Sequence, residues 1–295
     1  MRALLTGSAG PLLPLLRERL RGGAELVQLG GDWQPGLAIA SGDLRDPADL
    51  RAAADGADVV VADLQGLLVA LEAAGMAEAE LGEGLVEVTE GLAAATRAVG
   101  ARRLLVLGSA RAIRARAGAG EPCLDADDLR HWPRMAALRL AMDHAARAAA
   151  DRAVILAPAA LLGPSLPQSA LTRRLHLCRA GAAPPSAVVR LSLADARDAA
   201  AAAEAALHRG RAGATYVVGS TPFWLLTLDQ RVRPSAGPHR PAPPSPDDLP
   251  IGVAWERTRS RAATRDLGWW TRRPGATLAD TLRAMDAVDA RIGLS

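Results

Sequence analysis

The chain begins with a short apolar stretch that leads directly into a glycine-rich turn. Arg2–Thr6 has the composition of a buried strand, and an Arg/Leu-rich helix is expected to follow the turn and run to about Arg21. The turn contains Gly7 and Gly10, two of the three glycines of a Gly-x-x-Gly-x-x-Gly pattern, with Leu13 at the third position. Backbone N–H groups at such a strand–turn–helix junction can bind a pyrophosphate. The opening of the chain therefore predicts a dinucleotide site, with an ordinary strand–helix turn as the alternative for this pattern alone.

Strands and helices alternate along the first half of the chain. Asp46 and Pro47 are typical of a helix start, the first as N-cap and the second at the first helical position. Further helices are expected at 83–99 and 134–150, and further strands at Glu25–Leu29, 37–40, 58–62, Arg103–Leu107 and 153–156. This order predicts an α/β fold, a Rossmann-type doubly wound parallel sheet with a smaller C-terminal substrate-binding domain.

The pattern becomes less regular beyond Pro158. We expect a turn at 161–164, helices at 166–180 and 195–208, a strand at Thr215–Val218, a proline-rich surface loop at 233–250, and two closing amphipathic helices at 258–266 and 277–292. Residues 1–157 are predicted to form the dinucleotide-binding domain. Residues 158–295 are predicted to form mainly the substrate-binding part, with the segment from about 187 to 218 returning to the Rossmann sheet.

Composition argues against several classes of partner. The chain has 295 residues with a net charge of +3, and all its basic side chains apart from histidine are dispersed arginines. This pattern disfavours nucleic acid as a partner, and no apolar run is long enough to span a membrane. Cys123 and Cys178 lack ligand spacing, so neither a metal site nor a disulfide framework is expected. We expect a cytoplasmic protein with a small-molecule substrate.

Several short motifs, in order along the chain, are similar to those of one known family. Residues 42–46 and 56–60 are similar to its third strand, following helix and fourth strand. Residues 86–91 and 105–110 are similar to the helix and strand that lead to its catalytic serine, and 265–269 to its closing Leu-Gly-Trp element. Together they resemble the extended short-chain dehydrogenases/reductases of the epimerase/dehydratase type. The resemblance implies a Rossmann-type fold, a nicotinamide cofactor and chemistry at a carbon–oxygen bond.

The catalytic residues of that family are a serine and the two ends of a Tyr-x-x-x-Lys helical turn. Ser109 matches the serine, which would contact the substrate carbonyl, with a strand-end serine bonded to its own backbone as the alternative. Counting back from Asp143 places Met135 at the tyrosine position and Arg139 at the lysine position. A thioether transfers no proton, whereas arginine can still donate to ribose hydroxyls, with an ordinary helix-surface arginine as the alternative for Arg139. The resemblance therefore implies a reductase scaffold without its usual acid.

Few other side chains can take the place of that acid. The chain contains no lysine, and its one tyrosine, Tyr216, matches a structural strand of the family. His131 lies just before the helix that carries Met135 and is a candidate proton relay, although a lone histidine is more often structural.

The resemblance also assigns residues to the cofactor. Gly30 and Gly31 stand at the tip of the second strand, where an acid would bind the ribose 2′-OH of NAD, so NADPH is expected in preference to NADH. Asp43 fits the residue that contacts adenine, with an ordinary turn aspartate as the alternative. The expected cofactor-binding residues are Thr6, Gly7, Ser8, Gly10, Pro11, Leu12, Gly30, Gly31, Asp43, Leu44, Ala62, Asp63, Arg139 and Pro158.

These features predict NADPH-dependent reduction of a ketone on a bulky, largely apolar substrate. Within the family the chain resembles the simocyclinone-type angucyclinone ketoreductases, which implies a polycyclic aromatic polyketide substrate and a role in antibiotic biosynthesis. The proton would then come from the substrate or from solvent. Two alternatives stay open, a catalytically silent NADP(H)-binding sensor and a nucleotide-sugar epimerase or dehydratase. Against the second, Ala157-Pro158 replaces the Arg-Pro turn of the sugar enzymes, and the chain has no asparagine.

Overall fold

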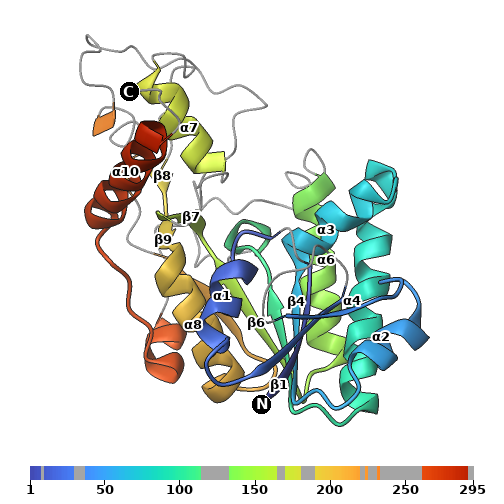
Figure 1. The fold of residues 1–295 in the computed structure, drawn as a ribbon. Helices are drawn as coiled ribbons and strands as arrows, with labels where there is room; N and C mark the ends of the chain where they lie inside the picture. Colours follow the sequence, from blue (N-terminus) through green and yellow to red (C-terminus); the bar gives the residue numbers. More distant parts are fainter. Residues whose placement is uncertain are drawn as a thin grey trace, which may run out of the picture.

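A seven-stranded sheet forms the centre of the molecule (Figure 1). The computed structural model describes residues 1–7, 10–29, 37–113, 133–164, 170–180, 190–219, 223–224, 231–232 and 261–291. The strand order is β10-β6-β5-β4-β1-β2-β3, and all neighbouring strands are parallel. The strands are β1 (Arg2–Thr6), β2 (Glu25–Leu29), β3 (Ala38–Ala40), β4 (Val59–Asp63), β5 (Arg103–Leu107), β6 (Ala153–Pro158) and β10 (Thr215–Val218).

Helices cover both faces of this sheet (Figure 1). One face carries α2 (Pro47–Ala53), α3 (Leu64–Ala73), α4 (Leu81–Ala98) and α6 (Pro133–Ala148), and the other carries α1 (Leu13–Leu20) and α8 (Ala196–Arg209). Because side chains alternate along a strand, Val60 of β4 packs into the first core and Val59 and Val61 pack into the second. Burial on both faces explains the continuous apolar sequence of this strand. The arrangement confirms the predicted Rossmann-type doubly wound fold.

A smaller part of the chain stands beside the sheet, at the upper left of Figure 1. It contains β7 (Ala160–Leu162) paired with β9 (Leu193–Asp195), β8 (Arg190–Leu191) paired with β11 (Phe223–Trp224), and the helices α7 (Ala170–Arg179) and α10 (Pro274–Arg291). Leu162, Leu175, Leu193 and Leu278 are buried together in its core. The part therefore has an apolar centre of its own beside the two cores of the sheet.

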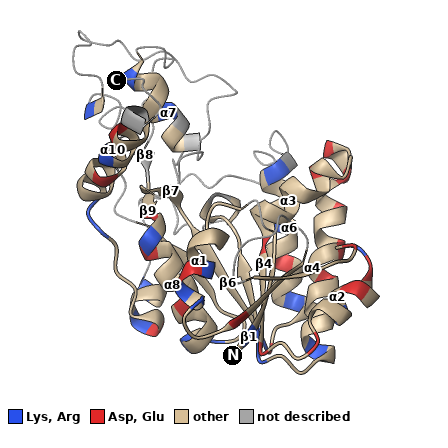
Figure 2. Ribbon diagram, viewed as in Figure 1, with Lys and Arg blue, Asp and Glu red and all other residues tan. Residues whose placement is uncertain are grey.

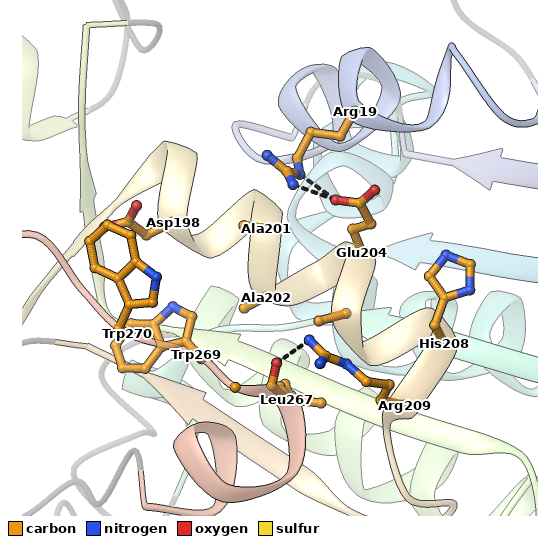
Figure 3. A pocket seen from close by; sticks show the side chains of 12 residues that line it. Arg19, Asp198, Ala201, Ala202, Glu204, His208, Arg209, Leu267, Trp269 and Trp270 are labelled. Atoms are coloured by element: carbon orange, nitrogen blue, oxygen red, sulfur yellow. Dashed lines mark hydrogen bonds and ion pairs between the residues drawn. The ribbon is translucent and has the colours of Figure 1, made fainter.

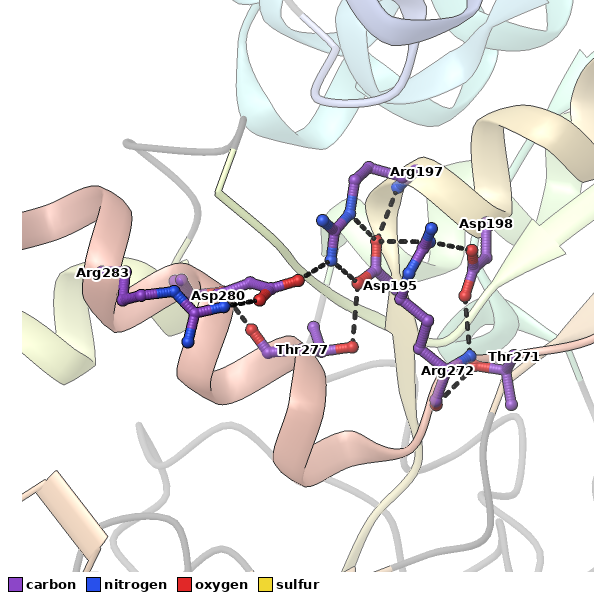
Figure 4. A network of polar contacts seen from close by, with 9 residues as sticks. Asp195, Arg197, Asp198, Thr271, Arg272, Thr277, Asp280 and Arg283 are labelled. Atoms are coloured by element: carbon purple, nitrogen blue, oxygen red, sulfur yellow. Dashed lines mark hydrogen bonds and ion pairs between the residues drawn. The ribbon is translucent and has the colours of Figure 1, made fainter.

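A polar network joins the start of α8 to α10 (Figure 4). The fully buried Asp195 caps α8 by accepting the backbone N–H of Arg197 at 2.9 Å. The guanidinium of Arg197 donates to Asp195 at 2.6 Å and to Asp280 of α10 at 2.7 Å, and the hydroxyl of Thr277 donates to Asp195 at 2.8 Å. Burial raises the pKa of Asp195, but the bonds from Arg197 and Thr277 outweigh burial, and the net pKa is lowered. Asp195 therefore stays ionised and holds the two helices together.

Most predicted elements occur within a few residues of their expected bounds, and one prediction is wrong. The turn predicted at 161–164 is wrong in its first half, because Leu161 and Leu162 belong to β7 and pair with β9. Helix α3 was not predicted from the sequence. The helix predicted at 166–180 is described from Ala170 onward, and the predicted loop at 233–250 lies outside the described residues. The division into domains at residue 157 stays a prediction, although β10 does join the main sheet beside β6.

Charged residues of both signs are interspersed along the outer helices (Figure 2). Arg19 and Glu204 pair between α1 and α8, and Arg134 pairs with Glu72 between α6 and α3. In the described part of the chain, no helix has the length and apolar character needed to cross a bilayer.

Candidate functional site

The strand order reverses direction between β1 and β4, which lie next to each other at the middle of the sheet. The two strands are in register, with Thr6 opposite Ala62, and the hydroxyl of Thr6 donates to the carbonyl of Val61 at 3.0 Å. In open α/β sheets, ligands bind in the crevice at the carboxyl ends of the strands where the order reverses. The residues that follow Thr6 and Ala62 therefore form the candidate site.

The glycine-rich turn after β1 packs directly against the start of α3. Gly7 has a φ of +87°, which favours glycine, and a Cβ atom on it would lie 2.3 Å from the carbonyl oxygen of Asp63. A Cβ atom on Gly66 would lie 1.8 Å from the carbonyl oxygen of Gly7, and one on Gly10 would lie 1.9 Å from Oδ2 of Asp63. These three glycines are thus required by close contact within the protein, at the edge of the crevice.

Asp63 is the last residue of β4 and the N-cap of α3. Its Oδ1 accepts the backbone N–H groups of Gln65 at 3.2 Å and Gly66 at 3.4 Å. The side chain is buried, and its Oδ2 has no hydrogen-bond partner among the described residues. Burial raises the pKa of Asp63 to about 7, against the lowering effect of the backbone N–H groups of Gly66, Gln65 and Leu13. The carboxyl group therefore changes its charge near neutral pH.

The backbone donors at the start of α1 are fewer than in a full glycine pattern. Pro11 lies in the turn and Pro14 in the first turn of the helix, and proline has no N–H group. The N–H of Gly10 donates to the carbonyl of Gly7 at 3.2 Å, and the N–H of Leu13 faces Asp63. A phosphate at this helix start would share its donors with the carboxylate of Asp63.

The next strand carries the predicted serine to the same edge of the sheet. Ser109 lies two residues after β5 and is 3% exposed, and β5 pairs with β4 so that Leu107 is opposite Asp63. Helix α6 packs over this strand end, because a Cβ atom on Gly108 would lie 2.5 Å from the sulfur of Met142. The predicted catalytic helix is therefore held at the carboxyl end of β5.

Met135 and Arg139 lie one turn apart on that helix, α6. Met135 is half-buried and packs against the first apolar core. The guanidinium of Arg139 donates to the carboxylate of Asp143 at 2.7 Å along the same helix, and both side chains are partly exposed. This ion pair gives Arg139 a defined position on the helix, while its predicted contact with a ribose stays a prediction.

Some of the remaining predicted residues lie in the described part of the chain, and the others do not. Asp43 is exposed and accepts the backbone N–H of Arg45 at 2.8 Å, as a turn aspartate does, and Pro158 ends β6 at the same sheet edge. Leu12 is buried in the second core, and Leu44 is half-buried against the first core. Ser8, Gly30, Gly31 and His131 lie outside the described residues, and so the predicted preference for NADPH and the proton relay stay predictions.

A hollow of about 370 Å³ lies along α8, near the last turn of α1 (Figure 3). Alanines of α8 line it, Arg19 pairs with Glu204 at 2.5 Å, and Arg209 donates to the carbonyl of Leu267. Helix α1 begins at the glycine turn, and Arg19 lies in its last turn. The length of α1 therefore separates this hollow from the crevice. We assign the candidate site to the crevice.

Comparison with known proteins supports the fold but gives no close relative. No protein-family model matches the chain, and no curated protein matches it either. Among solved structures, WbmG of Bordetella bronchiseptica in complex with NAD and UDP matches with a TM-score of 0.76 and 20% identity, over 98% of this chain and 96% of that one. A nucleoside-diphosphate-sugar epimerase from Pseudomonas aeruginosa matches with a TM-score of 0.73 and 21% identity, over 97% and 98% of the two chains. MoeE5 in complex with UDP-glucose and NAD matches with a TM-score of 0.70 and 19% identity, over the full length of both.

Sequence reasoning identified Asp63 only as one of the residues beside the cofactor. It did not identify the carboxylate as a buried group inside the turn, nor the partners Gly10 and Gly66. The available indication was the order Ala62-Asp63-Leu64, in which an acid after an apolar strand is a typical N-cap for a following helix.

Proposed function

We propose that the protein binds a nicotinamide dinucleotide in the β1–β4 crevice and catalyses hydride transfer at a carbon–oxygen bond of a small molecule. The observation that supports this most directly is the convergence of the turn after Thr6, Asp63 and Ser109 at the carboxyl ends of three adjacent strands. Solved structures with the same fold contain NAD together with UDP or UDP-glucose.

The order of strand, turn and helix supports a dinucleotide, and the charge of Asp63 favours it in only one protonation state. Gly7 and the start of α1 lie at this edge of the sheet, where a pyrophosphate would be favoured by the helix dipole. An ionised Asp63 opposes the same phosphate, whereas a neutral Asp63 does not. When bound, the nicotinamide supplies or accepts the hydride. Arg139 would then hold the ribose hydroxyls, and Ser109 would donate to the reacting oxygen.

The chain itself offers no proton donor at Met135, because a thioether has no labile proton. A general acid contributes typically about 10²–10⁴-fold, whereas holding the reactants in place contributes as much or more. A substrate that carries its own acidic or hydrogen-bonded hydroxyl group therefore suits this site. The proton on the reacting oxygen is exchanged with that hydroxyl group or with solvent.

The first substrate class is a nucleoside-diphosphate sugar, undergoing epimerisation or dehydration through oxidation at a carbinol carbon. It is favoured by the ligands and names of the solved structures with this fold. A second class, favoured by Met135, is a bulky apolar ketone such as that of a polycyclic aromatic polyketide, reduced with NADPH. The thioether suits an apolar wall better than a polyhydroxylated sugar.

The test compares the two classes on the same protein preparation. Binding of NADH and NADPH is measured by calorimetry, and then the protein is incubated with NAD⁺ and a panel of UDP-sugars, or with NADPH and polycyclic ketones. We expect sugar products detected by NMR for the first class, or loss of nicotinamide absorbance for the second. Nucleotide binding without turnover of either panel would favour the silent sensor, and failure to bind either nucleotide at pH 6 would contradict the proposal.

A further inference from the structure

The carboxyl edge of β1 and β4 contains an anionic group of the protein, where the resemblance implies the anions of a ligand. Asp63 is 2% exposed, its Oδ2 would lie 1.9 Å from a Cβ atom on Gly10, and Oδ2 has no hydrogen-bond partner among the described residues. The N–H of Leu13, the first residue of α1, faces the same group. The positive end of this helix is therefore shared with a side chain of β4.

A carboxylate and a pyrophosphate compete for this helix end. The N-terminus of a helix carries about half a positive charge, and an ionised Asp63 brings a full negative charge to it. Pro11 and Pro14 remove two backbone donors that would otherwise offset this charge. An ionised Asp63 thus leaves little positive potential for a phosphate.

We propose that the protein binds its dinucleotide together with a proton on Asp63, so that this residue makes nucleotide affinity depend on pH. The inference rests on the proposed function, and it goes beyond it by assigning a regulating group to the phosphate-binding turn. The proton is taken up from solvent onto Oδ2 as the phosphate arrives, and it is released when the nucleotide leaves. No bond to the nucleotide is formed or broken in this step.

Asp63 is the group that we expect to titrate, because the other charged groups on the surrounding elements lie away from it. On β1 and β5 the charged residues are Arg2 and Arg103, which lie at the strand ends opposite to Asp63. On α1 and α3 they lie one turn or more along the helix from Asp63, and they are Arg17, Glu18, Arg19 and Glu72. On α4, which packs over β4, they are Glu83, Glu87, Glu90 and Arg97. None of these is among the causes of the raised pKa of Asp63, which are burial and three backbone N–H groups. The pKa of about 7 places the change in charge within the accessible pH range.

The experiment measures the dissociation constants of NADH and NADPH between pH 5.5 and 8.5 for the full chain and for three variants. Asp63→Asn and Asp63→Ser remove the charge and keep a side chain able to cap α3. Asp58→Asn is the matched control, because Asp58 is an exposed acid at the opposite end of β4. NADH is the decisive probe, since the 2′-phosphate of NADPH titrates near pH 6 itself.

For the unmodified chain we expect NADH binding to be constant below pH 6 and to weaken by about tenfold per pH unit above pH 7, which is about thirtyfold weaker at pH 8.5 than at pH 5.5. Calorimetry in two buffers of different ionisation enthalpy should show uptake of close to one proton per NADH at pH 8. Asp58→Asn should retain this slope, and both Asp63 variants should lose it.

Two results would overturn the inference and leave the proposed function standing. One is NADH binding that does not change with pH, and the other is a slope that persists in Asp63→Asn or Asp63→Ser. Failure of all four proteins to bind either nucleotide at pH 5.5, where Asp63 is neutral, would contradict the proposed function as well.

Discussion

The hydroxyl of Tyr216 donates to the carboxylate of Asp266 at 3.2 Å and accepts the backbone N–H of Arg211 at 3.0 Å. Tyr216 is fully buried in β10, the edge strand beside β6, and its ring packs in the second apolar core. The only tyrosine of the chain thus fastens β10 to the π-helical turn Ala263–Leu267. It is committed to structure at a place separate from the β1–β4 crevice.

Tyr216→Phe tests this assignment. The change removes two hydrogen bonds of a buried hydroxyl group, and we expect the free energy of unfolding to fall by about 1–3 kcal/mol. NADH binding and turnover at a temperature where the variant is folded should equal those of the unmodified chain. Urea unfolding and calorimetry measure the two effects. A variant of unchanged stability that has lost turnover would identify Tyr216 as the missing acid.

Asp63 should also influence stability in the absence of ligand. Its pKa is about 7 in the folded state, against an ordinary value of 3.8 in an unfolded chain. Between these values the folded state holds a proton that the unfolded state has lost, so the free energy of unfolding decreases as pH rises from about 4 to 7. Asp63→Asn removes this dependence. We expect the variant to be more stable than the unmodified chain by up to about 4 kcal/mol at pH 7.5 and equal to it near pH 4, in urea unfolding at several pH values. A constant difference across this range would show that burial does not shift the pKa of Asp63.

Thr277 and Thr281 form a matched pair for the network between α8 and α10. Both are buried threonines one turn apart on α10. Thr277 donates to the ionised Asp195 across the two elements, whereas Thr281 donates to the carbonyl of Thr277 within its own helix. We expect Thr277→Val to lower the free energy of unfolding by about 1.5–3 kcal/mol, because it removes a bond to a charged group, and Thr281→Val by less than about 1 kcal/mol. Equal losses of unfolding free energy in the two variants would mean that the bond from Thr277 to Asp195 contributes no more than a bond within one helix.

The sheet was predictable because its strands are buried on both faces. Runs such as Val59-Val60-Val61 are apolar throughout, and a parallel sheet covered by two helix layers requires that composition. Burial on most sides also made α3, Leu64–Ala73, hard to predict, since a helix that is apolar on most sides shows little helical periodicity. Its N-cap, Asp63, was assigned to the cofactor alone.

The candidate site was predictable in position but not in charge. The motif at Gly7 and Gly10 indicates the crevice, because strand, turn and helix follow one another in the sequence. The contact between Gly10 and Asp63 joins residues that are distant in sequence, and it depends on β1 lying next to β4 in the sheet. The ion pair of Arg139 with Asp143 has a helical spacing of four residues and could have been expected from the sequence.

Ser109 and Met135 should differ in their effect on turnover if the proton comes from substrate or solvent. Met135 has no proton to give, so Met135→Phe should keep turnover within about tenfold, provided that the half-buried side of α6 accepts the larger ring. Ser109→Ala removes a hydroxyl group at the end of β5 and should lower turnover by about 10²-fold through the lost bond to the reacting oxygen, with nucleotide affinity unchanged. Steady-state rates with whichever of the two proposed substrate classes is turned over, together with NADH affinity, measure both. A loss in Met135→Phe as large as that in Ser109→Ala, in a variant of unchanged stability and nucleotide affinity, would show that Met135 lies against the substrate itself and shapes its position.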